Sequence, residues 1–144
     1  MSNHGATLDD LVDVYTKQVR SILEFGVPVW NSSITKEEVK DLERVQKCFH
    51  QIALGRNYSN YSNALAQTGL DTLEIRRTKL CLSFVKKAVK HPKHSYWFSQ
   101  KSDRKLPNTR SVKLKFSEPL CRLERFKNSP IPYLTRLLNE HNQL

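Results

Sequence analysis

Apolar residues recur at helical spacing along most of this chain, and strong helix start and stop signals separate the resulting segments. Three long helices are predicted, over residues 7–26, 35–55 and 71–90, because apolar side chains three and four positions apart line one face of each. Thr35 with Glu38 forms a capping box. A short helix is expected over residues 62–68. The sequence therefore predicts an all-α fold, a small helical bundle of three long helices plus one or two short ones, with a basic, partly extended C-terminal arm.

The first long helix has an unusual ending, the sequence ILEFGVPVW at residues 22–30. The side chains of its expected buried face run from Leu8 through Tyr15 and Val19 to Ile22 and Leu23. Gly26 and Pro28 are expected to stop the helix, and we predict that residues 27–30 are not helical. This apolar segment should cross the bundle as a strap that fills the gap before the second helix. Trp30 is then a core anchor.

The chain beyond Pro92 loses its helical regularity. We predict a helical thumb-like bundle over residues 1–92, a basic linker or extended segment over 93–119, and a short helical segment over 120–144, opened by Ser129-Pro130. The alternation of SVKLKF, residues 111–116, favours a strand or extended arm. Tyr96, Trp97 and Phe98 form an aromatic cluster near Lys101, Arg104 and Lys105. Such a cluster can stack unpaired bases or close the end of the helical core, and we favour the second role.

The charge of the chain, +10 overall, is divided unevenly. Residues 1–70 hold seven Lys/Arg and eight Asp/Glu, a net charge of −1, whereas residues 71–144 hold seventeen and six, a net charge of +11. A polyanionic partner explains this asymmetry, nucleic acid before a membrane surface; basic charge retained for solubility is the alternative. The three cysteines are far apart and odd in number, which favours free thiols and an intracellular location, nuclear or cytoplasmic. We expect no membrane segment.

The predicted third helix carries the clearest functional signal. Its apolar side chains cover a wide arc, so we expect it to be buried around most of its girth, with Arg77 inside that arc beside Glu74. The remaining strip is almost entirely cationic and is formed by Arg76, Lys79, Lys86, Lys87 and Lys90. A strip of one sign favours contact with a phosphate backbone, which positions a protein without reading sequence. The alternative is an ordinary solvated helix face.

Catalytic and metal-binding patterns are sparse. Cys48 with His50, and His91 with His94, have spacings that occur in metal sites, but zinc needs about four ligands brought together. The adjacent Asp9 and Asp10 lie in a predicted first helical turn, where acidic residues are expected. The sequence contains no phosphate-binding glycine loop or nucleophile elbow. We therefore expect no metal, no cofactor, no small-molecule substrate and no stand-alone enzyme activity.

Three segments in a fixed order resemble the C-terminal portion of reverse transcriptases encoded by non-LTR, jockey-like retrotransposons. They are ILEFGVPVWNSSITKEEVKDLERVQKCFHQIALG at 22–55, TGLDTLEIRRTKL at 68–80, and RFKNSPIPYLTRLLN at 125–139. The resemblance implies the thumb and post-thumb region of an RNA-directed DNA polymerase, which grips the template–primer duplex through backbone contacts. It also implies that the polymerase palm with its catalytic aspartates is missing, so the chain looks like a truncated element.

These observations predict a non-catalytic nucleic-acid-binding fragment that contacts an RNA or DNA duplex, with the remaining polymerase domains as a further candidate partner. The residues expected to contact phosphate are those of the cationic strip together with Arg104, Lys105, Lys113 and Lys115. The alternatives are a helical scaffold that binds other proteins without nucleic acid, and an inert remnant of a mobile element.

Overall fold

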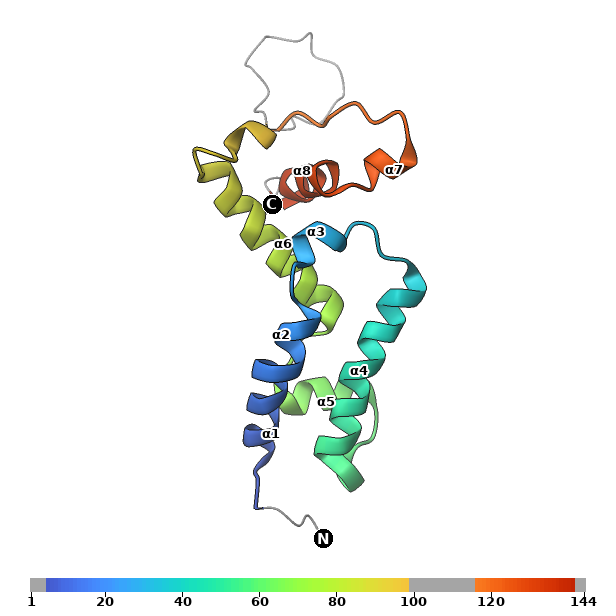
Figure 1. The fold of residues 1–144 in the computed structure, drawn as a ribbon. Coiled ribbons are helices and arrows are strands. Elements are labelled where there is room, and N and C mark those ends of the chain that lie inside the picture. Colours follow the sequence, from blue (N-terminus) through green and yellow to red (C-terminus); the bar gives the residue numbers. More distant parts are fainter. Residues whose placement is uncertain (1–4, 99–115, 142–144) are drawn as a thin grey trace. The chain divides into compact units, whose positions relative to one another are not determined.

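The computed structural model describes residues 5–98 and 116–141, which form two compact units. Unit 1 comprises residues 1–26 and 34–77, and unit 2 comprises residues 27–33 and 78–144. The described residues are predominantly helical, which confirms the predicted all-α class (Figure 1). Among these residues, no helix has both the length and the apolar content needed to cross a membrane. The units do not coincide with the ranges 1–92, 93–119 and 120–144 expected from the sequence.

Unit 1 is built from helices that contact one another along an apolar seam. Its elements are α1 (Leu8–Val14), the π-helical segment η1 (Tyr15–Val19), α2 (Arg20–Leu23), α4 (Lys36–Leu54), η2 (Gly55–Asn57), α5 (Tyr61–Thr68) and the start of α6 (Leu73–Lys90). α4 contacts both α1 and α5 (Figure 1). The second long helix and the short helix therefore lie where the sequence predicts them.

Local capping fixes these helix boundaries. Thr7 accepts a hydrogen bond from the backbone N–H of Asp10, and Thr35 accepts one from Glu38. In both cases the acidic side chain accepts a bond from the threonine backbone, which completes a capping box. Gly69 ends α5 in the left-handed conformation, with φ of 65°, which costs glycine little. α6 begins after Thr72, whose hydroxyl accepts from the N–H of Ile75, so the predicted start at residue 71 is slightly early.

The first helix departs from its predicted face because it changes register. Over η1 the backbone follows a π-helical path, which places an extra residue in the turn and rotates the residues that follow. Tyr15 is buried, whereas Ile22 is 75% exposed. The prediction that Val19 and Ile22 lie on the buried face was therefore wrong, since a regular period of 3.6 residues does not hold across this segment.

Unit 2 assembles around residues from distant parts of the sequence. It contains α3 (Val27–Trp30), most of α6, η3 (Ser95–Trp97), α7 (Glu124–Lys127) and α8 (Pro130–His141) (Figure 1). α8 begins at Ser129-Pro130 as predicted. The buried core comprises Val27, Cys81, Val85, Ala88, Phe98, Phe116, Leu134 and Leu138. Asn139 accepts from the Phe116 backbone N–H at 3.0 Å and donates to its carbonyl at 3.1 Å, which ties that segment to α8.

The segment after Gly26 corrects two predictions. Residues 27–30 form a helical turn, because Pro28 lies in the first turn, where its missing N–H has no intrahelical partner to lose. This turn contacts α8, and Trp30 packs partly buried against the unit 2 core. The segment is therefore part of unit 2 and is not a strap before the second helix. Asn31 donates a hydrogen bond to the Tyr133 hydroxyl at 3.0 Å, which anchors it there.

α6 is buried along a narrow stripe, not around most of its girth as predicted. The buried side chains repeat at intervals of three or four residues and are Leu73, Arg77, Cys81, Val85 and Ala88. Ile75 is 48% exposed and Phe84 is 40% exposed, although both belong to the predicted apolar arc. Arg77 lies inside the stripe, as the sequence predicts. The sequence pattern overestimated the buried width of α6, because few other elements are available to cover the apolar side chains of this helix.

Candidate nucleic-acid interface

The two structural units divide the charge of the chain as unevenly as a cut between residues 70 and 71 does. Unit 1 contains nine Lys/Arg and ten Asp/Glu, a net charge of −1. Unit 2 contains fifteen and four, a net charge of +11. The stretch 78–98 has five lysines and no acidic residue. The part of unit 2 that the structure describes, residues 27–33, 78–98 and 116–141, holds nine Lys/Arg and three Asp/Glu. This part is therefore basic by itself and is the place to look for a polyanion site.

Four lysines of α6 lie on one flank of this unit. At about 100° per residue, Lys79, Lys86 and Lys90 fall within about 40° of one another, and Lys87 lies about 80° from Lys79. All four are exposed, whereas the core residues Cys81, Val85 and Ala88 occupy the opposite side of the helix. From Lys79 to Lys90 the axial rise is about 16 Å. We call these four residues the lysine strip.

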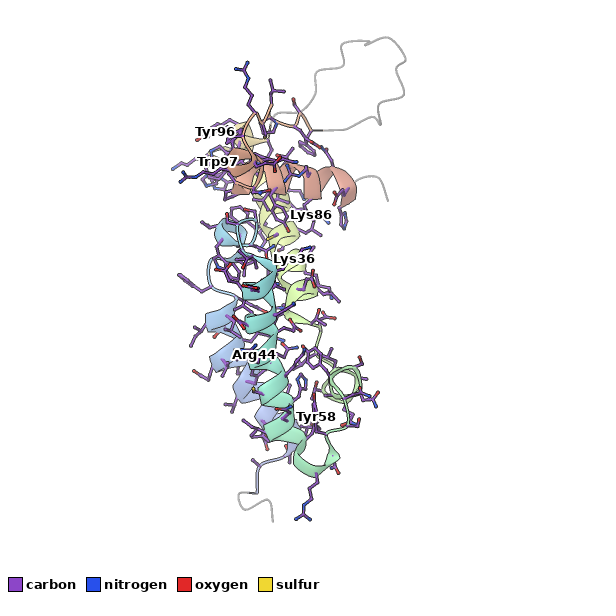
Figure 2. All side chains as sticks on the ribbon, turned by 90° about the vertical axis from the view of Figure 1, so that its right-hand side faces the viewer. Lys36, Arg44, Tyr58, Lys86, Tyr96 and Trp97 are labelled. Atoms are coloured by element: carbon purple, nitrogen blue, oxygen red, sulfur yellow. The ribbon has the colours of Figure 1, made fainter. Side chains whose placement is uncertain are left out.

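The lysine strip has few anionic neighbours. Lys86, Lys87 and Lys90 make no ion pair with any residue in the described ranges 5–98 and 116–141. The Lys86 amino group lies 3.4 Å from Nε2 of His141 at the end of α8 (Figure 2 labels Lys86). Cations of unit 1 differ, since Lys17 pairs with Asp13 and Arg44 pairs with Asp41. These three lysines can therefore neutralise an external anion without first breaking an internal ion pair.

Arg76, the first residue of the predicted strip, belongs to unit 1. Its Nε donates to Oε1 of Glu24 at 2.9 Å, and the same carboxylate oxygen lies 3.5 Å from Nε of Arg20. The Glu24 side chain is only 12% exposed. This arrangement ties Arg76 to α2 and its C-terminal end. The other predicted contacts, Arg104, Lys105, Lys113 and Lys115, lie outside the described residues, as does most of the predicted strand at 111–116.

Further exposed cations of unit 2 were missed because they lie outside regular amphipathic patterns. They are Lys93, Arg122, Arg125 and Lys127. Lys127 pairs with Glu124 at 3.2 Å, and its backbone carbonyl accepts from the guanidinium of Arg136. α7 thus presents Arg125 and Lys127 on either side of Phe126, which is 47% exposed. The sequence signal for the cations of α7 was the alternation of basic and aromatic residues in RFK, residues 125–127.

An apolar groove crosses unit 2. It has a volume of about 690 Å³ and is lined by Pro28, Val29, Phe84, Trp97, Phe98, Ser117, Pro119, Phe126, Ser129, Pro130, Ile131 and Leu134.

Phe98 is buried in the core, which supports the predicted closing role for that residue. Trp97 is only partly buried, and its indole lies 4.6 Å from the His94 ring at a tilt of 34°. The His94 ring in turn stacks at 4.7 Å on His91. Figure 2 shows Tyr96 and Trp97 together, apart from Lys86.

The interior of unit 1 contains a separate polar cluster centred on Gln46. The Tyr15 hydroxyl donates to Oε1 of Gln46 at 3.1 Å, and Nε2 of Gln46 donates to the Tyr61 hydroxyl at 3.2 Å and the Asp71 carbonyl at 2.9 Å. The Tyr61 hydroxyl also donates to Glu43. Burial raises the pKa of Tyr15 to about 12, and burial followed by the bond to Glu43 raises the pKa of Tyr61. Both phenols therefore remain protonated donors at neutral pH.

His50 is the buried histidine of the same unit. Its Nδ1 lies 2.8 Å from the Gln46 carbonyl and its Nε2 lies 3.0 Å from the Thr68 hydroxyl. Burial lowers the pKa of His50, with the bond to the Gln46 carbonyl opposing that shift. Its sequence neighbour Cys48 is exposed, so the two side chains point in different directions. Across residues 5–98 and 116–141, no three His, Cys, Asp or Glu side chains gather in a way that could hold a metal ion.

Searches for related proteins add no family to this description. No protein-family model, curated protein or solved structure matches the chain.

Proposed function

We propose that unit 2 binds the phosphate backbone of a nucleic-acid duplex through the lysine strip of α6. The observation that carries this proposal is the positive charge of unit 2, together with Lys86, Lys87 and Lys90, which are exposed on α6 and form no ion pair with the residues that the structure describes. A polyanion gains affinity at such a surface by releasing its condensed counterions. The resemblance to retroelement reverse transcriptases supports the same partner, because the corresponding thumb region grips a template–primer duplex.

The binding is independent of sequence. Lysine amino groups contact phosphates as point charges and carry no information about base identity. Removing three lysine contacts makes the slope of log K against log salt concentration shallower by about 2.7, at about 0.9 for each phosphate contact on B-form DNA. The same loss is expected for duplexes of unrelated sequence.

The test is a salt titration of blunt-duplex binding by the full chain and by a triple variant, K86Q/K87Q/K90Q. A matched control, K36Q/K40Q/R56Q, removes three exposed cations from unit 1 and therefore the same total charge. We expect the first variant to lose most of its affinity and salt dependence, and the control to retain both. Equal losses in the two variants would indicate attraction by net charge alone and would contradict a site on α6.

We propose further that the chain has no polymerase activity by itself, since the resemblance leaves out the palm and its catalytic aspartates. Purified protein should extend no primer on an annealed template under any divalent cation tested. Nucleotide incorporation that survives further purification of the protein would refute this part of the proposal.

A second candidate function, a helical scaffold for other proteins, is favoured by an apolar groove in unit 1. Its volume is about 350 Å³, and it is lined by Leu11, Val14, Tyr15, Val19, Val45, Cys48, Phe49, Ile52 and Ala53. Ile52 is 81% exposed at this surface, and exposed apolar patches often mark interaction sites. Sedimentation velocity of the wild type and I52S distinguishes the functions. Self-association without nucleic acid that I52S abolishes favours the scaffold.

A further inference from the structure

The groove of unit 2 combines aromatic walls with an almost complete lack of hydrogen-bonding side chains. Four of its lining residues are aromatic, namely Phe84, Trp97, Phe98 and Phe126. The polar side chains in the lining are Ser117 and Ser129, and the Ser129 hydroxyl already donates to the Phe126 carbonyl at 2.7 Å. A ligand held here gains from flat apolar contact and finds few groups to read its polar edges.

A rim of cationic side chains on α6 and α7 adjoins residues that line the groove, and one of these cations, Lys127, is paired with Glu124. Lys87 lies three residues after Phe84 on α6, so the two side chains are neighbours on the helix surface. Arg125 and Lys127 flank Phe126 on α7, and all three side chains are exposed. On the helical wheel, Lys87 falls between the other lysines of the strip and Phe84. The groove is therefore continuous with the lysine strip along the surface of α6.

We infer that this groove takes unpaired bases of a single-stranded nucleic-acid segment adjoining the bound duplex. This inference rests on the proposed duplex contact and extends it from duplex to single-stranded nucleic acid. A base offers a flat π-face to the aromatic walls while its phosphate meets the cationic rim. An acidic amphipathic peptide satisfies the rim as well, but it makes no particular use of four aromatic walls. The volume of about 690 Å³ lies in the range of pockets that take small organic ligands, a size class that includes a nucleotide.

Stacking in such a groove is tolerant of base identity, because every base has a π-face and the lining supplies few groups for readout. The expected preference is therefore for a junction of duplex and single strand over blunt duplex, with little dependence on the sequence of the overhang. We expect an overhang to increase affinity about tenfold, the equivalent of about 1.4 kcal/mol.

The experiment compares fluorescence anisotropy of labelled blunt duplex and of the same duplex with a short oligo-dT overhang, at one salt concentration. The variants are F84S and F126S, whose side chains are partly exposed, so that both should fold; circular dichroism checks this. The matched control is L120S, since Leu120 is 83% exposed in the same unit and does not line the groove. F84S and F126S should lose the overhang advantage and keep blunt-duplex affinity, while L120S should keep both.

A second readout places the base beside the groove itself. The chain has two tryptophans, so W30F leaves Trp97 as the single tryptophan, whose emission can be excited selectively. Oligo-dT overhangs should quench it, whereas blunt duplex should leave it largely unchanged. Blunt-duplex binding without an overhang advantage overturns the groove assignment alone, and absence of all binding overturns the proposed function as well. If an acidic amphipathic peptide fails to displace the overhang, the assignment is supported. If the peptide binds and the protein shows no preference for an overhang, the assignment is overturned.

Discussion

The Gln46 side chain joins η1, α5 and the segment just before α6 in unit 1, and its replacement by leucine tests what holds these elements together. Gln46 is completely buried and makes three hydrogen bonds, to Tyr15, Tyr61 and the Asp71 carbonyl. Leucine has nearly the same length and fills most of the space. The substitution therefore removes polar interactions with little change in packed volume.

The expected loss follows from those three bonds. A typical intramolecular hydrogen bond contributes about 0.5–1.5 kcal/mol, and a buried donor left unsatisfied costs about 1–3 kcal/mol. Tyr61 retains its bond to Glu43, whereas the Tyr15 hydroxyl, in a side chain only 2% exposed, loses its acceptor. We expect Q46L to lower the free energy of unfolding by about 2–4 kcal/mol. The control Q51L changes an exposed glutamine of the same helix and should stay within about 0.5 kcal/mol of wild type.

The assay is urea denaturation followed by far-UV circular dichroism, with amide hydrogen exchange in α4 to localise the effect. A double-mutant cycle with Y15F makes the test sharper. Y15F alone should cost about 1–2 kcal/mol, because it leaves Oε1 of Gln46 without its donor. In the Q46L background Y15F should cost nothing or stabilise, since it removes an orphaned hydroxyl. Equal costs of Y15F in both backgrounds would refute the reasoning.

Three further predictions concern single side chains. Burial lowers the pKa of His50 below its ordinary 6.5, so the free energy of unfolding should be full above about pH 6.5 and fall as the pH drops below it. H50Q should flatten this slope in a pH series of urea melts; an unchanged slope contradicts the assignment to His50. T35A should lower the free energy of unfolding by about 1 kcal/mol by removing the capping box of α4, and T35S should restore most of it. W30A should lower the free energy of unfolding by about 3 kcal/mol, which is at the lower end for such substitutions because Trp30 is partly exposed. A loss of less than about 1 kcal/mol in the same melts contradicts the anchoring role of Trp30.

Local signals in the sequence were sufficient to predict helix class and most boundaries. Capping at Thr35 and the stop at Gly69 depend on residues a few positions apart, so they can be read without tertiary structure. The π-helical segment at Tyr15 could not be read this way, because a one-residue change of register leaves no marker in composition. The helical turn at Val27 was rejected because of Gly26 and Pro28, although proline is acceptable in the first turn of a new helix.

The candidate site was predicted only in part. Exposed lysines on one flank of α6 follow from helical spacing, which is a local property. The bond from Arg76 to Glu24 joins residues 52 positions apart, and no local pattern indicates such a pair. The groove likewise needs Val29, Phe84 and Ile131 from three separate stretches. No pattern in the sequence indicates that Arg76 and Lys79 belong to different units, because the boundary between the units falls inside one continuous helix.

The interleaved order of the units also has a consequence for how the chain is made. Val27 and Asn31 leave the ribosome well before α8, which they contact, and the bond from Asn31 to Tyr133 spans 102 residues. Closing so long a loop is slow compared with forming the nearby contacts of unit 1. We therefore expect unit 1 to fold first, with α3 exposed as an apolar segment that waits for its partner. A nascent chain stalled before residue 130 should present Val27 and Trp30 to chaperones. Emergence of α8 from the ribosome should end that exposure.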